Sequence, residues 1–243
     1  MNVKINHRRW LVGMFLSLLA VLAFFIWASA DIDSGVYVDC SCYGSADRRC
    51  VSLTFDDGPD EIMTPKVLDV LCKYNVKATF FIIGEKAEKH PDIVRRIVNE
   101  GHIIGAHSWS HSCYFPIQSP QTIYNELCKC EELIYDLTGK RILLFRPPFG
   151  VTNPLVAKAV EAKEFKCVGW SIRSLDTDES EDRLDVFKRV VRKLHNGGVI
   201  LLHDRCDNAD QLLEMLISEL LNKDYDIINL DEMFEIDPYQ SEI

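Results

Sequence analysis

The sequence has no cluster of lysine and arginine residues beyond scattered pairs. Its first 30 residues hold three of the 27 basic residues and no acid, which leaves 24 basic against 37 acidic side chains in the remainder. Proteins that bind nucleic acid display basic patches that contact the phosphates. We therefore expect no nucleic-acid partner, and a neutral sugar polymer fits this composition better.

The chain also has no Cys-x-x-Cys pair among its nine cysteines, so a thiolate zinc site is not expected. The odd number means that at least one cysteine is free or pairs with another chain. Cys40, Cys42 and Cys50 are close enough in sequence for a local disulfide where thiols are oxidised. Four others lie in or beside apolar segments, as small buried hydrophobic residues do: Cys72, Cys128, Cys167 and Cys206.

No charge interrupts the apolar run at residues 10–27, which follows Lys4, Arg8 and Arg9. At about 1.5 Å per residue such a run barely spans a membrane, so residues 1–30 are either a single-pass anchor or a signal peptide. Residues 28–30 have the small-x-small form of a cleavage site, whereas the length of the run favours a retained segment. In both cases the basic flank predicts export of the rest of the chain to the cell envelope.

Two adjacent carboxylates, Asp56 and Asp57, follow a strand-like stretch and precede Gly58 and Pro59. Acids before Gly-Pro are common in turns. Carboxylates this close also repel each other unless a cation or a proton neutralises one of them. The pair therefore indicates either a simple turn or a site where one carboxylate binds a metal and the other acts as a base.

His107 and His111 have a spacing that predicts two imidazoles on one side of a helical turn, where they could share an ion. A catalytic zinc ion usually has three protein ligands, so a carboxylate of the Asp pair would complete the set. The same spacing also occurs by chance in surface helices and in protein cores.

Two further polar clusters follow apolar stretches that are typical of buried strands. Arg146 comes after residues 142–145, and His203 comes after residues 199–202. Taken singly, Arg146 fits a surface salt bridge and His203 fits a hydrogen-bonded core histidine. Four polar clusters that each end a strand indicate one shared site instead.

Strand-like and helix-like segments alternate from residue 50 onwards, which predicts an α/β fold with a parallel sheet and helices outside it. The expected strands are residues 51–55, 78–83, 103–106, 142–145, 165–170, 199–202 and 225–229. The expected helices are residues 65–74, 92–100, 120–137, 182–194 and 210–222. Polar clusters at the carboxyl ends of strands predict a distorted, incomplete barrel. Residues 31–48 are either a linker or a segment draped over it.

In these motifs and their order, the sequence resembles the polysaccharide deacetylase (NodB-homology) family, also called carbohydrate esterase family 4. The first, second, third and fifth motifs correspond to residues 54–58, 107–111, 146–150 and 201–203. Residues 170–177 match the fourth only in part, because members commonly carry an acid at Arg173 and a tryptophan at Thr177. The resemblance covers roughly residues 49–236 and implies a (β/α)7 barrel with an open groove for a polymer.

The resemblance also implies a metal site and a base. Asp57, His107 and His111 would hold a divalent metal, most often zinc, with cobalt or another divalent metal as the alternative. Asp56 would be the general base that takes a proton from the attacking water, whose pKa such a metal lowers to about 7.

The remaining motif residues would handle the leaving group and the developing charges. His203 would be the general acid that protonates the departing sugar nitrogen. Arg146 would pair with Asp56, Asp176 would orient His203, and the backbone N–H of Phe149 would stabilise the oxyanion. Arg173 could weaken the imidazolium of His203, reach a substrate anion or simply lie on the surface.

We therefore expect residues 49–243 to form one metal-dependent catalytic domain. It would remove N-acetyl groups from amino sugars of a polysaccharide, namely peptidoglycan N-acetylglucosamine or chitin-type oligomers, and release acetate. An O-acetyl polysaccharide esterase is one alternative, because an alkoxide leaving group needs the His203 proton less. A catalytically weak glycan-binding domain is another, if Arg173 disables the site.

Overall fold

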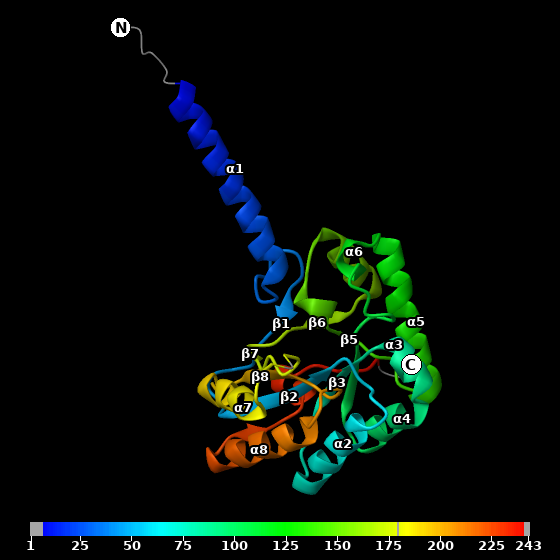
Figure 1. Ribbon diagram of the computed structural model, residues 1–243. Coiled ribbons are helices and arrows are strands. Elements are labelled where there is room, and N and C mark those ends of the chain that lie inside the picture. Colours follow the sequence, from blue (N-terminus) through cyan, green and yellow to red (C-terminus); the bar gives the residue numbers. More distant parts are fainter. Residues whose placement is uncertain (1–6, 179, 241–243) are drawn as a thin grey trace.

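The computed structural model describes residues 7–178 and 180–240, and its central sheet is parallel (Figure 1). The strands are β1 (Cys40–Ser41), β2 (Cys50–Asp56), β3 (Thr79–Ile82), β4 (Ile103–Ala106), β5 (Leu144–Phe145), β6 (Lys166–Val168), β7 (Ile172–Arg173), β8 (Gly198–His203) and β9 (Asp226–Ile227). Their order is β1–β6–β5–β4–β3–β2–β8–β7, and β9 pairs with β2. Among these described strands β1 and β7 do not pair with each other, which confirms the predicted distorted, incomplete barrel. All seven predicted strands are present, and β1 and β7 were not predicted.

The helices are α1 (His7–Ala30), α2 (Met63–Tyr74), α3 (Gly84–Lys89), α4 (Pro91–Asn99), α5 (Pro120–Thr138), α6 (Pro154–Lys163), α7 (Arg183–Arg192), α8 (Ala209–Asn222) and α9 (Leu230–Phe234), with short 3-10 turns at Phe115–Ile117 and Pro148–Gly150. Most of them pack around the outside of the sheet, whereas α1 projects from it (Figure 1). The five predicted helices correspond to α2, α4, α5, α7 and α8.

The alternation of side chains along β2 separates the core from the site. Successive side chains of a strand point to opposite faces. The side chains on one face of β2 pack against the helices in the main hydrophobic core: Val51, Leu53 and Phe55. Thr54 and Asp56 face the barrel interior instead, and the Thr54 hydroxyl donates to the Ile200 carbonyl at 2.8 Å. The interior face thus carries polar groups up to the carboxyl end of the strand.

A smaller apolar cluster fills the barrel interior beneath those polar ends. It consists of Phe81, Ile103, Leu144, Val168, Val199 and Leu230. The polar groups that can meet a ligand therefore lie above this cluster, at the rim formed by the carboxyl ends of the strands.

A disulfide joins Cys40 in β1 to Cys167 in β6, so the local disulfide that the spacing of Cys40, Cys42 and Cys50 would allow is not formed. The two residues are register partners on adjacent strands although they are 127 positions apart. Cys42 and Cys50 are buried and free. The interpretation of Cys167 as a small buried hydrophobic residue is wrong, and Cys72 is exposed. Pairing depends here on sheet register, which spacing in the sequence does not reveal.

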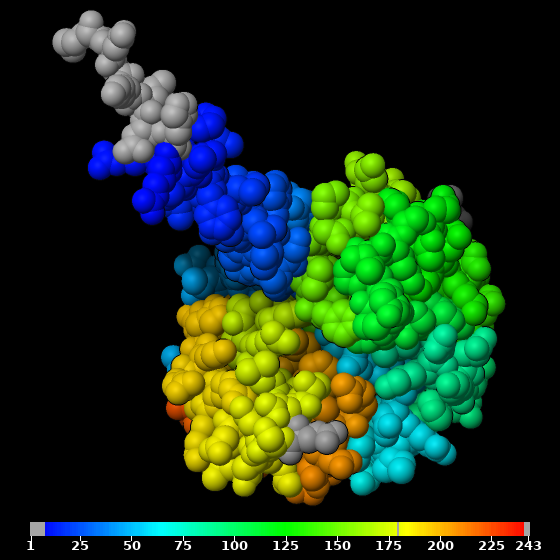
Figure 2. Space-filling model, turned by 45° about the horizontal axis from the view of Figure 1, so that its top comes forward, coloured from blue at the N-terminus to red at the C-terminus, as the bar shows by residue number. Residues whose placement is uncertain are grey.

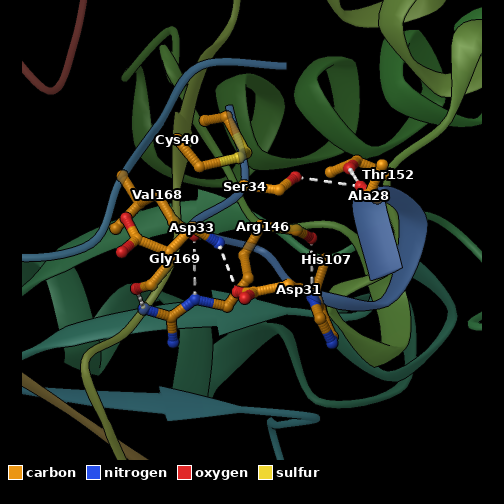
Figure 3. Close-up of a disulfide and its surroundings, with 11 residues drawn as sticks. Ala28, Asp31, Asp33, Ser34, Cys40, His107, Arg146, Thr152, Val168 and Gly169 are labelled. Carbon is orange, nitrogen blue, oxygen red and sulfur yellow. Dashed lines mark hydrogen bonds between the residues drawn. A yellow bond between two sulfur atoms is a disulfide. The ribbon is translucent and has the colours of Figure 1, made fainter. Parts of the chain in front are cut away.

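The last turn of α1 is attached directly to the barrel (Figure 3). Ala28 is buried, and its carbonyl accepts from the Ser34 hydroxyl at 2.9 Å. The Ser29 carbonyl accepts from the Thr152 N–H at 3.1 Å. Earlier residues of α1 stand away from the barrel (Figure 2). Among the described helices, α1 is the one long and apolar enough to cross a membrane.

Candidate active site

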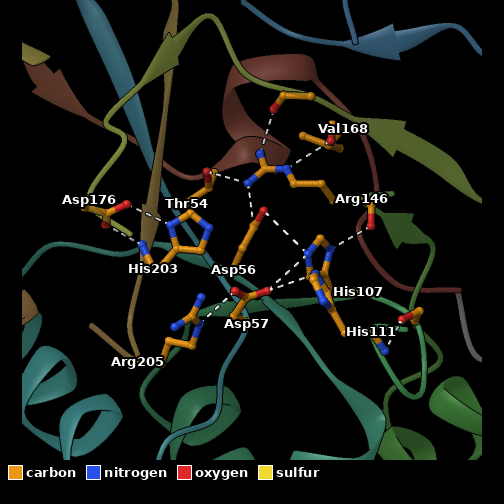
Figure 4. Close-up of polar contacts among 12 residues, drawn as sticks. Thr54, Asp56, Asp57, His107, His111, Arg146, Val168, Asp176, His203 and Arg205 are labelled. Carbon is orange, nitrogen blue, oxygen red and sulfur yellow. Dashed lines mark hydrogen bonds and ion pairs between the residues drawn. The ribbon is translucent and has the colours of Figure 1, made fainter. Parts of the chain in front are cut away.

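The motif segments meet at one rim of the barrel, around a cavity of about 220 Å³ (Figure 4). Because the strands are parallel, residues at or just after their carboxyl ends lie at the same edge. The cavity is lined by groups from the first, second, third and fifth motifs and from the segment after β6, including Asp56, Asp57, His107, His111, Phe149, Trp170, Arg173 and His203.

A fully buried guanidinium holds Asp56. Arg146 Nη1 donates to Asp56 Oδ1 at 2.7 Å and to the Thr54 hydroxyl at 2.9 Å. The other guanidinium N–H groups donate to the carbonyls of Val168 and Gly169 at 3.1 and 2.6 Å. A buried charge is costly unless it is paired, so this set of partners fixes both the guanidinium and the carboxylate. Asp56 Oδ2 remains directed toward His107, 3.9 Å from Nε2.

Asp57 turns its carboxylate toward two histidines. Its φ of 71° lies in the left-handed region and ends the strand alternation. Oδ1 lies 3.5 Å from His107 Nε2 and 3.2 Å from His111 Nε2, and the three atoms lie within 4.8 Å of one another. In the part of the chain that is described, this buried oxygen has no hydrogen-bond partner.

The hydrogen bonding of His107 makes this cluster suitable for a cation. His107 Nδ1 lies 2.8 Å from the Arg146 carbonyl oxygen. A carbonyl only accepts, so Nδ1 donates to it, and Nε2 faces Asp57 Oδ1. The Nε2 atoms of both histidines and the unpartnered Asp57 oxygen thus converge on one point, as metal ligands do. The three residues therefore fit a metal ion.

The electrostatics keep the cluster in its ligating protonation states. Burial alone raises the pKa of Asp57, but His107 and the Arg205 guanidinium outweigh burial and lower this pKa well below its ordinary value. Burial and the neighbouring His107 lower the pKa of His111. Asp57 is thus a carboxylate and His111 a neutral imidazole near neutral pH, as metal binding requires.

The predicted helical turn between His107 and His111 is wrong. The segment is a loop in which Ser108 and His111 have positive φ values of 66° and 50°. The His111 N–H donates to the Ser108 hydroxyl at 3.0 Å. This tight turn, rather than helical periodicity, brings the imidazoles to the same carboxylate.

His203 and Asp176 form a second pair on the other side of the cavity. His203 Nδ1 lies 2.8 Å from Asp176 Oδ1, and the His203 backbone N–H donates to Oδ2 at 2.8 Å. Burial alone lowers the pKa of His203, but the hydrogen bond and charge of Asp176 outweigh burial and raise this pKa overall. Ser174 donates to the same carboxylate at 2.8 Å and fixes its orientation.

Phe149 lies at the mouth of the cavity. Its φ is 61°, and the edge of its ring meets His111 with the ring centroids 4.7 Å apart. The side chain is 49% exposed, so it borders the entrance instead of filling the core.

Three residues at the site were not predicted from the sequence. Arg205 Nε donates to Asp57 Oδ2 at 2.8 Å. Asp204 is buried, which raises its pKa to about 7, and accepts from the Thr64 hydroxyl at 2.6 Å. The position of Asp204 and Arg205 directly after His203 is the only sequence signal for these two residues. The third residue, Glu126 in α5, has no such signal.

Glu126 supports the loop that carries both histidines. The Trp109 and Ser110 N–H groups donate to its Oε2 at 3.2 and 3.3 Å, and the Ser110 hydroxyl donates to Oε1 at 3.1 Å. This carboxylate therefore holds the loop between the two imidazoles in its tight turn.

Comparison with known proteins identifies the family. The family model for polysaccharide deacetylases matches residues 43–168. The chain belongs to this family. It is 37% identical over 197 residues to a peptidoglycan-N-acetylglucosamine deacetylase of Bacillus cereus, a match that covers 79% of this chain and 70% of that protein.

Two further relatives agree with this assignment. A peptidoglycan-N-acetylglucosamine deacetylase of Listeria monocytogenes is 35% identical over 189 residues, 77% of this chain, and the chain spans 39% of the length of that protein. The crystal structure of the Bc1960 peptidoglycan N-acetylglucosamine deacetylase superposes with a TM-score of 0.77 at 35% identity, over 82% of this chain and 94% of that one.

The bonds of Glu126 lead to a prediction about metal affinity. Glu126→Ala removes the acceptor of three hydrogen bonds and should weaken zinc binding about 10- to 100-fold, the usual effect of losing support behind metal ligands. Glu126→Gln keeps one acceptor oxygen and should have a smaller effect. Zinc titration of the purified chain measures both.

The matched control is Glu132→Ala, which removes an exposed carboxylate from the same helix. Equal zinc affinity in Glu126→Ala and in this control would contradict the supporting role of Glu126.

Proposed function

We propose that this chain is a metal-dependent hydrolase that removes N-acetyl groups from amino sugars of peptidoglycan and releases acetate. Membership of the polysaccharide deacetylase family supports the reaction class, and the named activities of the relatives support the substrate. The observation that carries the proposal is one buried oxygen of Asp57 between two imidazoles, with Asp56 and His203 held beside it by separate partners.

Asp57, His107 and His111 would hold the metal. One carboxylate and two imidazoles are the donor set of a catalytic zinc site, which leaves a position for water. When bound, such an ion lowers the pKa of water and polarises the acetyl carbonyl.

Asp56 has the position of a general base. Its Oδ1 is bound by Arg146, whereas Oδ2 faces the space beside His107. A water molecule there can give its proton to Oδ2 while its oxygen attacks the acetyl carbon. Arg146 keeps the carboxylate ionised and oriented for this transfer. The backbone N–H of Phe149, at the mouth of the same cavity, is the proposed donor to the oxyanion, a contribution of about 3 kcal/mol at comparable sites.

His203 has the position of the general acid. Asp176 engages Nδ1 and leaves Nε2 for the substrate. As the C–N bond breaks, the nitrogen takes the proton from Nε2, and a free amine and acetate leave. An amide requires this proton because an amine anion is a poor leaving group. Asp176 acts through His203 and is therefore a positioning residue.

Metal dependence distinguishes the proposed roles of the two carboxylates. Chelation should stop acetate release from N-acetylated glycan, and zinc or cobalt should restore it. Asp56→Asn should retain the metal and lose about 10²- to 10⁴-fold in kcat, the usual contribution of a general base. His107→Ala should lose metal and activity together.

Metal content and acetate release are measured on the same preparations, with His90→Ala as the control for loss of a histidine outside the site. Equal metal loss in Asp56→Asn and His107→Ala would reverse the assignment of the carboxylates.

The Asp176–His203 pair predicts a pH effect. A histidine with a raised pKa keeps its proton to higher pH, so activity that needs this proton declines only above that pKa. Asp176→Asn removes the charge and the hydrogen bond that raise the pKa of His203, so this pKa should fall. The alkaline limb of kcat/KM should therefore move to lower pH. An unchanged profile with a uniformly reduced rate would show that Asp176 has a structural role only.

We also propose that α1 is retained as a membrane anchor and that the catalytic domain lies outside the cytoplasmic membrane. Ala28 of the small-x-small segment is buried against the barrel, and residues 10–27 are exposed along an apolar helix. The mature protein should keep its N-terminus and remain in the membrane fraction. Leu18→Arg places a charge in the span and should weaken membrane retention. Intact-mass measurement that finds a chain beginning at Asp31 would refute retention.

A further inference from the structure

A second cavity of about 860 Å³ lies between the end of α1 and the barrel. Trp170 and Arg173 line both this cavity and the catalytic one, so the two are adjacent. Its volume is within the range of ligand sites, about 300–1,000 Å³. A glycan bound at the catalytic site can therefore extend into it.

The walls of this cavity present aromatic side chains. Trp27, Tyr43 and Trp170 line it, and Trp27 and Tyr43 are 48% and 57% exposed. An exposed aromatic ring offers an apolar face, with a polar group at its edge, on which a sugar ring can stack. Because Trp170 borders both cavities, its ring and that of Tyr43 can contact a sugar beyond the reacting one.

Two cations stand in the wall of the cavity, together with two acids. Arg173 and Lys193 line it, and neither forms an ion pair with any residue of the described chain. The guanidinium of Arg173 lies 5.8 Å from the centre of the Trp170 ring. One charged group is thus held beside an aromatic face at the junction of the two cavities.

The two oxygens of Asp31 in the same cavity accept hydrogen bonds from neighbouring N–H groups. Asp31 Oδ2 accepts from the Trp27 indole N–H at 3.1 Å, and Asp31 Oδ1 accepts from the Asp33 backbone N–H at 3.1 Å. These bonds use Asp31 to shape the turn after α1. Asp33 in turn lies beside the buried Cys42 thiol, whose pKa burial and Asp33 raise to about 12. The two cations remain available to a ligand.

We propose that this cavity is a subsite for a carboxylate-bearing sugar of the glycan chain that is deacetylated at the catalytic site. The inference rests on the proposed function and narrows its substrate class to an acidic glycan. Arg173 is suited to bind the carboxylate through two N–H groups, and Lys193 adds a point charge. Arg173 is then a specificity-determining residue.

The test compares three substrates that differ in charge. They are neutral chitooligosaccharides, peptide-free peptidoglycan strands with a carboxylate on every second sugar, and the same strands with the carboxylates converted to N-methylamides. The measured quantity is the ratio of kcat/KM for acidic strands to kcat/KM for each neutral substrate. Arg173→Gln and Lys193→Gln should each lower this ratio about tenfold, mainly through KM, as expected for loss of one charge-assisted contact.

The matched control is Lys188→Gln, which removes a positive charge that pairs with Asp185 on α7. Its ratio should equal that of the unmodified chain. Lys193→Glu should lower the ratio further than Lys193→Gln, and amidation of the strands should remove the difference between the unmodified chain and the variants.

The outcomes separate this inference from the proposed function. If the unmodified chain releases acetate but shows no preference for acidic strands, or if the variants lose activity equally on all three substrates, the subsite is refuted and the deacetylase remains. A failure to release acetate from any of the three refutes the proposed function itself.

Discussion

The ion pair between Arg146 and Asp56 is the interaction on which the rest of the site depends. The guanidinium is fully buried, and it binds a carboxylate from β2, a hydroxyl from β2 and two carbonyls at the end of β6. Its own backbone carbonyl receives the Nδ1 proton of His107. A buried charge this well paired cannot move without exposing unpaired groups. One residue therefore fixes both the orientation of the proposed base and the tautomer of a proposed metal ligand.

Two adjacent carboxylates can have different tasks because each has its own environment. Asp56 continues the strand alternation and faces the interior, where Arg146 holds it. Asp57 leaves the strand with a positive φ, and Arg205 holds the oxygen that does not face the histidines. Each acid thus has one arginine and one free oxygen. The repulsion expected between neighbouring acids is reduced by two separate cations, which leaves both free oxygens available at the same cavity.

The sequence predicted the parts of this structure that depend on local pattern. Long apolar strands such as β2 and β8, and the motif residues at their ends, were found because their signals lie within a few residues. Strands of two residues, such as β1 and β7, carry too little pattern to be recognised. The turn at His107–His111 and the Cys40–Cys167 pairing depend on positive φ and on sheet register, which spacing does not encode. Glu126 acts from a helix through backbone N–H groups, so no motif marks it.

The Cys40–Cys167 bond closes a covalent ring that contains the first three motif segments. In an unfolded chain such a ring restricts how far those segments can separate, and loops of about 100 residues gain roughly 4 to 5 kcal/mol in this way. The ring can form only where thiols are oxidised. A chain that is held in a reducing compartment would therefore lack this restraint, and its three motif segments could separate further on unfolding.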